Sequence, residues 1–103
     1  MAKDNQQIGT DDMQQTIYKE LGYKSYPFPF TTPAYLEAYG TLVGLKPPTA
    51  KTARVLELGA TYGGNIISQA VHNPEATFVG IELSQDQVEK GNKIISDAKL
   101  ENV

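Results

Sequence analysis

The sequence of 103 residues contains no cysteine, and it contains a single histidine, His72. The absence of cysteine excludes disulfides, thiolate metal sites and a cysteine nucleophile. A lone histidine argues against a histidine-based metal centre or a histidine-centred triad, so we expect no metal site. His72 precedes Asn73 and Pro74, where a helix is expected to end and a positive charge is favoured, so we interpret it as structural.

The sequence also lacks a strong excess of either charge and lacks long apolar runs. The formal net charge is −3, with acidic and basic residues scattered, which does not indicate a surface for nucleic acid or an anionic membrane. No apolar run approaches the roughly 20 residues that a membrane span needs. The first residues, MAKDNQQIG, lack the apolar core of a secretory signal, so the expected location is cytoplasmic.

What the chain does have begins with an N-terminal arm rich in aromatic residues and proline, which we place at residues 1–46. Apolar residues at every fourth position predict a helix at about residues 10–21. The segment YKSYPFPF follows, and its two prolines favour an extended path that carries four aromatic side chains. Thr32 and Pro33 suit a helix start and predict a helix at about residues 33–44, before a proline-containing linker at 46–52.

From residue 47 to residue 103 the pattern changes to alternating strands and helices. Continuous apolar runs predict two strands buried on both faces, ARVLELG and TFVGIEL. NIISQAVH predicts a short helix, and Ser84 with Gln87 forms the pattern of a capping box for a second helix that reaches about residue 98. The order strand, helix, strand, helix is typical of an α/β protein with a parallel sheet covered by helices.

The sequence stops at LENV, where a third strand would start. Two strands with two helices form at best a marginal unit, so we expect the chain to be the N-terminal part of a larger protein. If the chain is stable alone, association or strand exchange between copies is an expected way to complete the sheet.

The segment VLELGATYGGN runs from the first strand through a glycine-rich turn into a helix. Such a turn lets the backbone approach a ligand, and the free N–H groups of the helix start face it. Gly59, Thr61 and Gly64 occupy the three positions of the dinucleotide fingerprint GxGxxG, so Thr61 departs from the pattern. A positive φ at Thr61 would carry a cost, because β-branched residues rarely adopt one. Asn65 either caps the following helix or contacts the ligand, and we favour the cap.

Two glutamates at the strand ends narrow the choice of ligand. Glu57 lies two residues before Gly59 and would repel a pyrophosphate while attracting a cationic group. Glu82 lies 19 residues after Gly63, where an acid accepts hydrogen bonds from both ribose hydroxyls and repels a 2′-phosphate. Leu83 is placed to flank an adenine ring. S-adenosylmethionine fits, since it has a ribose, an adenine and a positive end but no phosphate.

VLELGATYGGN with FVGIELS resembles motif I and the second-strand acid of class I S-adenosylmethionine-dependent methyltransferases, over roughly residues 53–103. The family pattern of an acid followed by spaced glycines is matched by Glu57, Gly59 and Gly63, with Thr61 as the departure. The upstream YPFPFTTPAYLEAYGTLVGLKPP is similar to the lead-in of a bacterial branch that carries a methyltransferase regulatory domain. The resemblance implies a Rossmann-like fold, of which residues 47–103 are the first β-α-β-α half.

The resemblance also implies an activity and a set of site residues. The activity is methyl transfer from S-adenosylmethionine to an unidentified acceptor, and some relatives methylate protein lysines. Glu57 would hold the methionine ammonium, and Glu82 the ribose diol. The implied cofactor-binding residues are Glu57, Gly59, Ala60, Thr61, Gly63, Glu82 and Leu83. Catalytic residues would lie beyond Val103, so the chain alone is expected to lack complete activity.

Three aromatic residues of the arm, Tyr26, Phe28 and Tyr35, have two interpretations. They either pack as structural residues or form a flap that contacts the cofactor or the substrate, because an N-terminal segment often crosses that face in such enzymes. Two rival functions stay open. One is an NAD-dependent oxidoreductase, and the other is a degenerate methyltransferase domain that only binds or regulates.

Overall fold

The computed structural model describes residues 24–103, so the helix expected at about residues 10–21 lies outside the described part of the chain. The chain order is η1 (Pro29–Thr31), α2 (Pro33–Leu42), η2 (Ala50–Thr52), β1 (Arg54–Leu58), α3 (Gly64–His72), β2 (Thr77–Ile81) and α4 (Gln85–Asp97), where η1 and η2 are short 3₁₀ helices. The predicted alternation of strands and helices is therefore confirmed, with element ends within about two residues of the expected positions.

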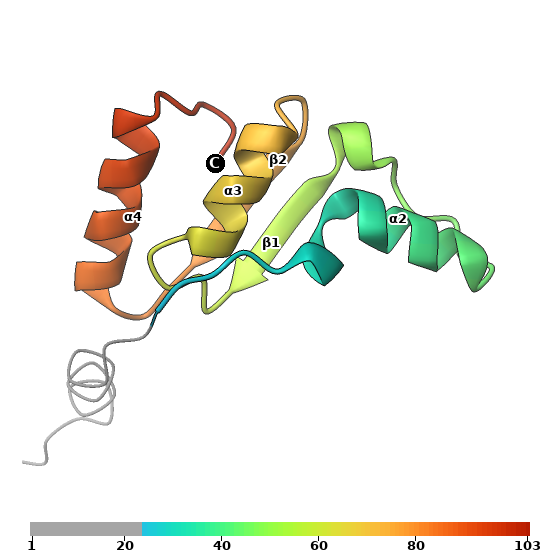
Figure 1. Ribbon diagram of the computed structural model, residues 1–103, viewed down its shortest axis with the longest axis horizontal. Helices are drawn as coiled ribbons and strands as arrows, with labels where there is room; N and C mark the ends of the chain where they lie inside the picture. Colours follow the sequence, from blue (N-terminus) through green and yellow to red (C-terminus); the bar gives the residue numbers. More distant parts are fainter. Residues whose placement is uncertain (1–23) are drawn as a thin grey trace, which may run out of the picture.

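β1 and β2 form a parallel two-stranded sheet. The register pairs Arg54 with Thr77 and Leu58 with Ile81, so both strands end at the same edge. In Figure 1, α3 lies over the strands, α4 lies beside α3, and α2 lies on the other side near β1. The chain is thus an α/β fold in which the loops that follow β1 and β2 leave the sheet side by side.

The core lies between β2, α3 and the turn that joins them. Phe78 is the largest fully buried side chain of the described residues. The buried cluster consists of Ala60, Ile66, Ile67, Ala70, Ala76 and Phe78, with Val55, Ile95, Leu100 and Val103 packed against it as half-buried residues. This cluster fixes α3 on the sheet, and through Ile95 it also anchors α4.

The opposite face of the sheet is open within residues 24–103, which corrects the prediction that both strands are buried on both faces. Four apolar strand residues point to this face and are 49–73% exposed, namely Leu56, Leu58, Val79 and Ile81. Successive side chains of a strand point to opposite faces, so a continuous apolar run supplies a second apolar face whether or not an element covers it.

The helix starts are correct in position, but the predicted side-chain caps are wrong. Ser84 precedes α4 and makes no side-chain capping hydrogen bond, and Gln87 Oε1 is buried without a partner among the described residues. The Ser84 backbone N–H donates instead to Glu82 Oε1 (3.0 Å), which ties the start of α4 to the end of β2. The Thr32 hydroxyl, before α2, donates to the Pro29 carbonyl (2.8 Å).

Two contacts hold α2 against the linker that leads to β1. The Ala50 backbone N–H donates to Glu37 Oε2 at 2.7 Å. Gly40 is buried against Pro47, where an added Cβ would lie 3.4 Å from the proline ring. α2 is therefore fixed to η2 although several of its apolar side chains, including Leu42 at 82%, are exposed.

Asn102 holds the last residues of the chain against β2 and the end of α3. Its carbonyl accepts a hydrogen bond from the Phe78 backbone N–H (2.8 Å), so residue 102 lies beside β2, where a third strand was expected to start. Its side-chain amide donates to the carbonyls of Ala70, Asn73 and Ala76, each at 3.1 Å. Among residues 24–103, no helix is both long enough and apolar enough to cross a membrane.

Candidate cofactor site

The two glutamates predicted from the strand ends lie at the same edge of the sheet. Glu57 pairs in register with Gly80, and Glu82 lies two residues after Gly80, just beyond the end of β2, a step of roughly 7 Å along an extended chain. The Glu57 side chain points to the same face of the sheet as the half-buried Val55. Glu82 lies four residues after the buried Phe78, so strand alternation directs it to that face as well. Both acids therefore project from the helix-covered side of the sheet, where the glycine-rich turn begins.

The turn between β1 and α3 needs positive φ at three positions. Gly59, Thr61 and Gly63 have φ values of 73°, 51° and 89°. An added Cβ at Gly63 would meet Ile67 Cδ1 at 2.5 Å, whereas one at Gly59 would meet nothing within 4 Å. A side chain at Gly63 would therefore force Ile67 to move as well as strain the backbone, while Gly59 borders open space. The positive φ considered for Thr61 is observed.

Glu82 holds the turn in this conformation. Its Oε2 accepts a hydrogen bond from the Thr61 backbone N–H (2.9 Å), and its Oε1 accepts one from the Ser84 N–H (3.0 Å). A left-handed conformation costs a non-glycine residue about 1–2 kcal/mol, which one hydrogen bond to a charged acceptor offsets at about 1.5–3 kcal/mol. Each carboxylate oxygen keeps a second lone pair for a ligand hydroxyl.

Asn65 does not cap α3 as was predicted, because it lies inside the helix and its side chain is directed into a buried polar cluster. Its Nδ2 donates to Glu57 Oε1 (2.9 Å) and to Thr31 Oγ1 (3.1 Å). Its Oδ1 accepts from the Phe28 backbone N–H (2.7 Å) and from Gln69 Nε2 (3.0 Å). Asn65 and Gln69 are 6% and 5% exposed. Glu57 Oε2 is buried and has no partner among residues 24–103.

A second contact between the arm and the turn involves Ser25, which the sequence reasoning did not identify. The Gly64 backbone N–H, at the start of α3, donates to Ser25 Oγ at 2.7 Å. The hydroxyls of Ser25 and Thr61 are in hydrogen-bond contact, and the Ser25 N–H donates to the Tyr62 hydroxyl at 3.3 Å. The arm therefore supplies the side chain that caps α3, a role that a neighbouring residue usually fills.

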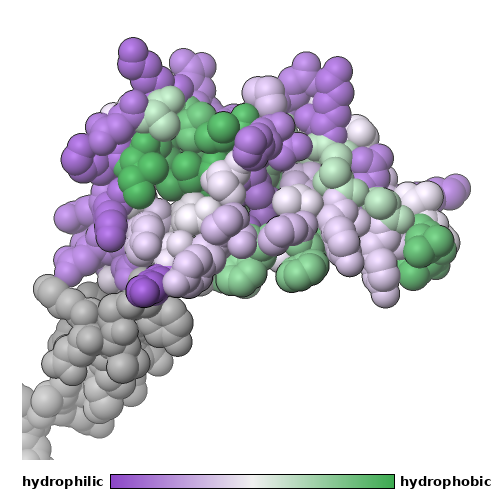
Figure 2. Space-filling view, in the orientation of Figure 1, coloured by the Kyte–Doolittle hydropathy of each residue, from purple (hydrophilic) through white to green (hydrophobic). Residues whose placement is uncertain are grey.

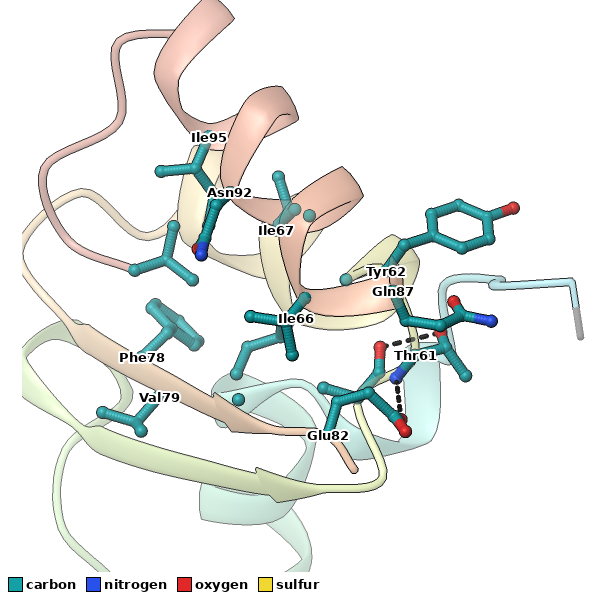
Figure 3. Close-up of a pocket in the computed structure, with 16 residues that line it drawn as sticks. Thr61, Tyr62, Ile66, Ile67, Phe78, Val79, Glu82, Gln87, Asn92 and Ile95 are labelled. Carbon is teal, nitrogen blue, oxygen red and sulfur yellow. Dashed lines mark hydrogen bonds between the residues drawn. The ribbon is translucent and has the colours of Figure 1, made fainter. Parts of the chain in front are cut away.

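A cavity of about 220 Å³ lies next to these residues. Its body is apolar and is formed by Ile66 and Ile67 of α3, Phe78 of β2 and Ile95 of α4, and its polar end holds Glu82 with Thr61 (Figure 3). Figure 2 shows the apolar surface gathered over this region between α3 and α4. Four predicted cofactor residues line the cavity: Ala60, Thr61, Gly63 and Glu82. Glu57, Gly59 and Leu83 do not.

The predicted set is therefore divided between two surfaces. The apolar body of the cavity continues the core between α3, α4 and β2, and it carries no acidic side chain besides Glu82, although the amides of Gln87 and Asn92 also line it. The strand-end edge carries both acids, the open Gly59 and the 62% exposed Leu83. We therefore assign the candidate site to the strand-end edge, where ligands of parallel α/β sheets bind, and treat the cavity as its neighbour.

The arm aromatics are not packed in the described core. Tyr26, Phe28 and Tyr35 are 55%, 50% and 49% exposed, and Tyr35 meets Phe30 edge to face with ring centroids 6.1 Å apart. The segment that carries Tyr26 and Phe28 lies across the start of α3, since the Phe28 N–H is bound by Asn65, whereas Tyr35 belongs to α2. Within residues 24–103, no cluster of three or more acidic or histidine side chains could hold a metal ion.

The sequence contained a signal for one of the missed contacts. Asn65 and Gln69 stand four residues apart on the face of α3 that also buries Ile66 and Ala70, and polar residues on a buried helix face need partners. Nothing local marked Ser25, because its partners Thr61 and Gly64 lie 36 and 39 residues further along the chain.

Comparison with known proteins agrees with this geometry. The chain is 41% and 42% identical over 86 residues to two uncharacterized proteins of Rickettsia prowazekii (strain Madrid E). These alignments cover 84% of this chain but only 16% and 34% of the two relatives. Two solved structures of PKMT2 from Rickettsia typhi, one of them in complex with AdoHcy, are 43% identical and superpose with TM-scores of 0.73 and 0.74. They match 79% of this chain, which spans 16% of PKMT2.

The match to a known family falls on the strand and helix part of the chain. A family described as "Putative methyltransferase" matches residues 51–103, which include β1, the glycine-rich turn, β2 and α4. Both acids and all the glycines of the turn lie in this range, so the matched part is the part that builds the candidate site. The chain therefore belongs to this methyltransferase family.

Proposed function

We propose that this chain is the cofactor-binding part of an S-adenosylmethionine-dependent methyltransferase. The observation that carries the proposal is the pair of acids, Glu57 and Glu82, at neighbouring ends of parallel strands around an open glycine turn. The 43% identity to a protein solved with AdoHcy supports it. The activity belongs to the whole protein, because the chain spans only a sixth to a third of the relatives it matches.

The residues at the site fit this cofactor in two respects. Glu57 Oε2 is buried without a partner among the described residues, and a buried carboxylate oxygen needs a donor, which an ammonium group supplies. Gly59 is exposed, and no atom lies within 4 Å of the place where a side chain would begin. A ligand without phosphate can lie against this backbone, since the nearby Glu57 carboxylate would oppose a pyrophosphate.

Each site residue has a role in binding or orientation. Glu57 would hold the methionine ammonium, and the turn from Gly59 to Gly63 would support the methionine and ribose. Glu82 would accept the ribose hydroxyls with the lone pairs left after it binds Thr61 and Ser84. The exposed Leu83 would flank the adenine. The bound cofactor supplies an electrophilic methyl group, and the protein contributes approach and orientation of the acceptor.

Protein lysine is the acceptor class that we propose, and the support for it is the resemblance to PKMT2, whose name denotes a protein lysine methyltransferase. The exposed Tyr26, Phe28 and Tyr35 suit this acceptor, because aromatic rings pack against an aliphatic lysine chain and attract its ammonium. The hydrogen bond from the Phe28 N–H to Asn65 keeps Phe28 next to the start of α3 and the cofactor turn.

Titration calorimetry of the full-length protein with AdoHcy and with NAD tests the cofactor class. We expect AdoHcy to bind and NAD to give no heat of binding. Binding of NAD alone would overturn the proposal in favour of an oxidoreductase. A methyl-transfer assay with S-adenosylmethionine and lysine-containing protein then separates an enzyme from a module that binds cofactor without turnover.

A further inference from the structure

Asn65 is the residue through which the arm and Glu57 meet. Its side-chain amide uses all four of its hydrogen-bonding positions, with two donor bonds to Glu57 and Thr31 and two acceptor bonds from Phe28 and Gln69. Two of these partners belong to the arm, at residues 28 and 31. One belongs to the proposed cofactor site.

The orientation of the Asn65 amide is fixed by the chemistry of its partners. The Phe28 backbone N–H can only donate, so it must face Oδ1, and the Glu57 carboxylate can only accept, so it must face Nδ2. The two contacts are 2.7 Å and 2.9 Å long. A rotated amide would lose both at once. One rigid amide therefore positions both the arm backbone and the Glu57 carboxylate.

This arrangement assigns different roles to the two oxygens of Glu57. Oε1 is held by Asn65, and Oε2 is buried and unpaired among residues 24–103. If Asn65 releases Oε1, the carboxylate is free to rotate and its unpaired oxygen is no longer held in one place. The orientation of the Glu57 carboxylate thus depends on whether the arm holds the Asn65 amide in place.

We propose that Asn65 is a positioning residue that couples docking of the arm to cofactor binding at Glu57. This inference rests on the proposed role of Glu57 toward the cofactor ammonium. Because coupling between two sites is reciprocal, an arm docked on Asn65 strengthens cofactor binding, and bound cofactor strengthens docking of the arm to the same degree. With the cofactor bound, the arm is then held over the part of the site where the methyl acceptor would enter.

The substitution Asn65→Asp removes the donation to Glu57, and with it the donation to Thr31, while it preserves the contact with the arm backbone at Phe28. The aspartate still accepts from Phe28 and Gln69, but it places an oxygen against Glu57 Oε1, where like charges repel. In the full-length protein we expect the Kd for AdoHcy to rise about tenfold, a usual size for coupling between sites. Ser68→Ala is the matched control, because the Ser68 hydroxyl donates to the backbone carbonyl of Asn65 and does not contact its side chain. The Kd of this variant for AdoHcy should stay unchanged.

A double-mutant cycle with Glu57→Gln separates positioning from general damage. A glutamine at position 57 can donate to the aspartate that replaces Asn65, so in the Glu57→Gln background the Asn65→Asp change should alter the Kd by less than about twofold, the scatter of independent substitutions. An equal penalty in both backgrounds, or no penalty with Glu57 present, overturns the inference. Absence of AdoHcy binding by the unmodified protein would instead sink the proposed function itself.

Hydrogen exchange at the Phe28 amide measures the other half of the coupling. We expect AdoHcy to slow exchange of this amide in the unmodified protein and to leave it unchanged in Asn65→Asp. Thr31→Val removes a hydroxyl that accepts from Asn65 and Gln69, so it should speed this exchange and weaken AdoHcy binding, while Thr31→Ser should restore both. An amide whose exchange AdoHcy leaves unchanged in the unmodified protein contradicts the coupling.

Discussion

The carboxylate of Glu82 accepts a hydrogen bond from the backbone N–H of Thr61 at 2.9 Å, which links the end of β2 to the turn that follows β1. Its other oxygen accepts from the Ser84 N–H. Glu82 therefore shapes the turn before it contacts any ligand. Because the Glu82 side chain both holds the turn and is proposed to bind the ligand, replacing it should change the conformation of the turn as well as the affinity of the site for the ligand.

Two substitutions at Glu82 separate these roles. Glu82→Gln keeps one acceptor oxygen but loses the charge, so we expect the Kd for AdoHcy to rise about tenfold or more, the loss of a charged hydrogen bond at about 1.5–3 kcal/mol. Glu82→Ala removes both acceptors and should also lower the free energy of unfolding by about 1–3 kcal/mol. Calorimetry and thermal unfolding measure the two effects. An alanine variant that binds AdoHcy like the unmodified protein would show that Glu82 is not used.

Thr61 carries backbone strain at its φ of 51°, and two variants isolate it. Thr61→Gly and Thr61→Val both lose the hydroxyl that contacts Ser25 and the Ala60 carbonyl, but only glycine tolerates the left-handed conformation. We expect the glycine variant to be more stable than the valine variant by about 1–2 kcal/mol in denaturant unfolding. Equal stability of the two variants would mean that the turn relaxes without cost.

Gly64 is a point of close approach between the arm and α3. An added Cβ would lie 2.6 Å from the backbone carbon and oxygen of Ser25, too close to be accommodated without movement of the arm. Alanine favours a helix by up to about 1 kcal/mol over glycine, so Gly64→Ala should keep α3 while it displaces residues 24–31. Limited proteolysis should cut the arm faster in this variant than in Ser68→Ala, an alanine on the same helix. Equal cleavage rates would place the arm elsewhere in solution.

Lys99 offers a stabilising change away from the site. It follows α4 with a φ of 53°, and the N–H groups of Lys99 and Leu100 donate to the carbonyls of Ser96 and Ile95, a helix ending in which glycine is preferred. Lys99→Gly should raise the free energy of unfolding by about 1 kcal/mol, the cost of a left-handed conformation for a residue with a side chain. Affinity for AdoHcy should not change. A lower unfolding temperature would contradict the prediction.

The features that were predictable from the sequence depend on local patterns. Apolar runs and helical spacing predicted β1, α3, β2 and α4, and two glutamates next to strand ends marked the edge of the sheet where they lie. The turn was recognised because Gly59 and Gly63 supply conformations that other residues avoid. These signals are contained within a few residues, so tertiary context did not override them.

The features that were not predictable depend on partners distant in sequence. The capping box of Ser84 and Gln87 is an exception, because the contact that replaces it is local: Glu82, two residues before Ser84, accepts a hydrogen bond from the Ser84 N–H. Asn65 was interpreted as a cap because its partners Phe28 and Thr31 lie more than 30 residues earlier. The exposed face of the sheet was also not predictable. An apolar run predicts that a strand prefers burial, but it does not predict which element covers the strand.

The amide of Asn102 also sets an order in which the protein can fold as it is synthesised. The carbonyls of Ala70, Asn73 and Ala76 precede their shared donor by 32, 29 and 26 residues. During synthesis these three carbonyls therefore remain hydrated until residue 102 is available to bind them. The hydrogen bonds that secure the end of α3 can form only after α4 has been synthesised. A ribosome pause within α4 would therefore leave the end of α3 without these bonds.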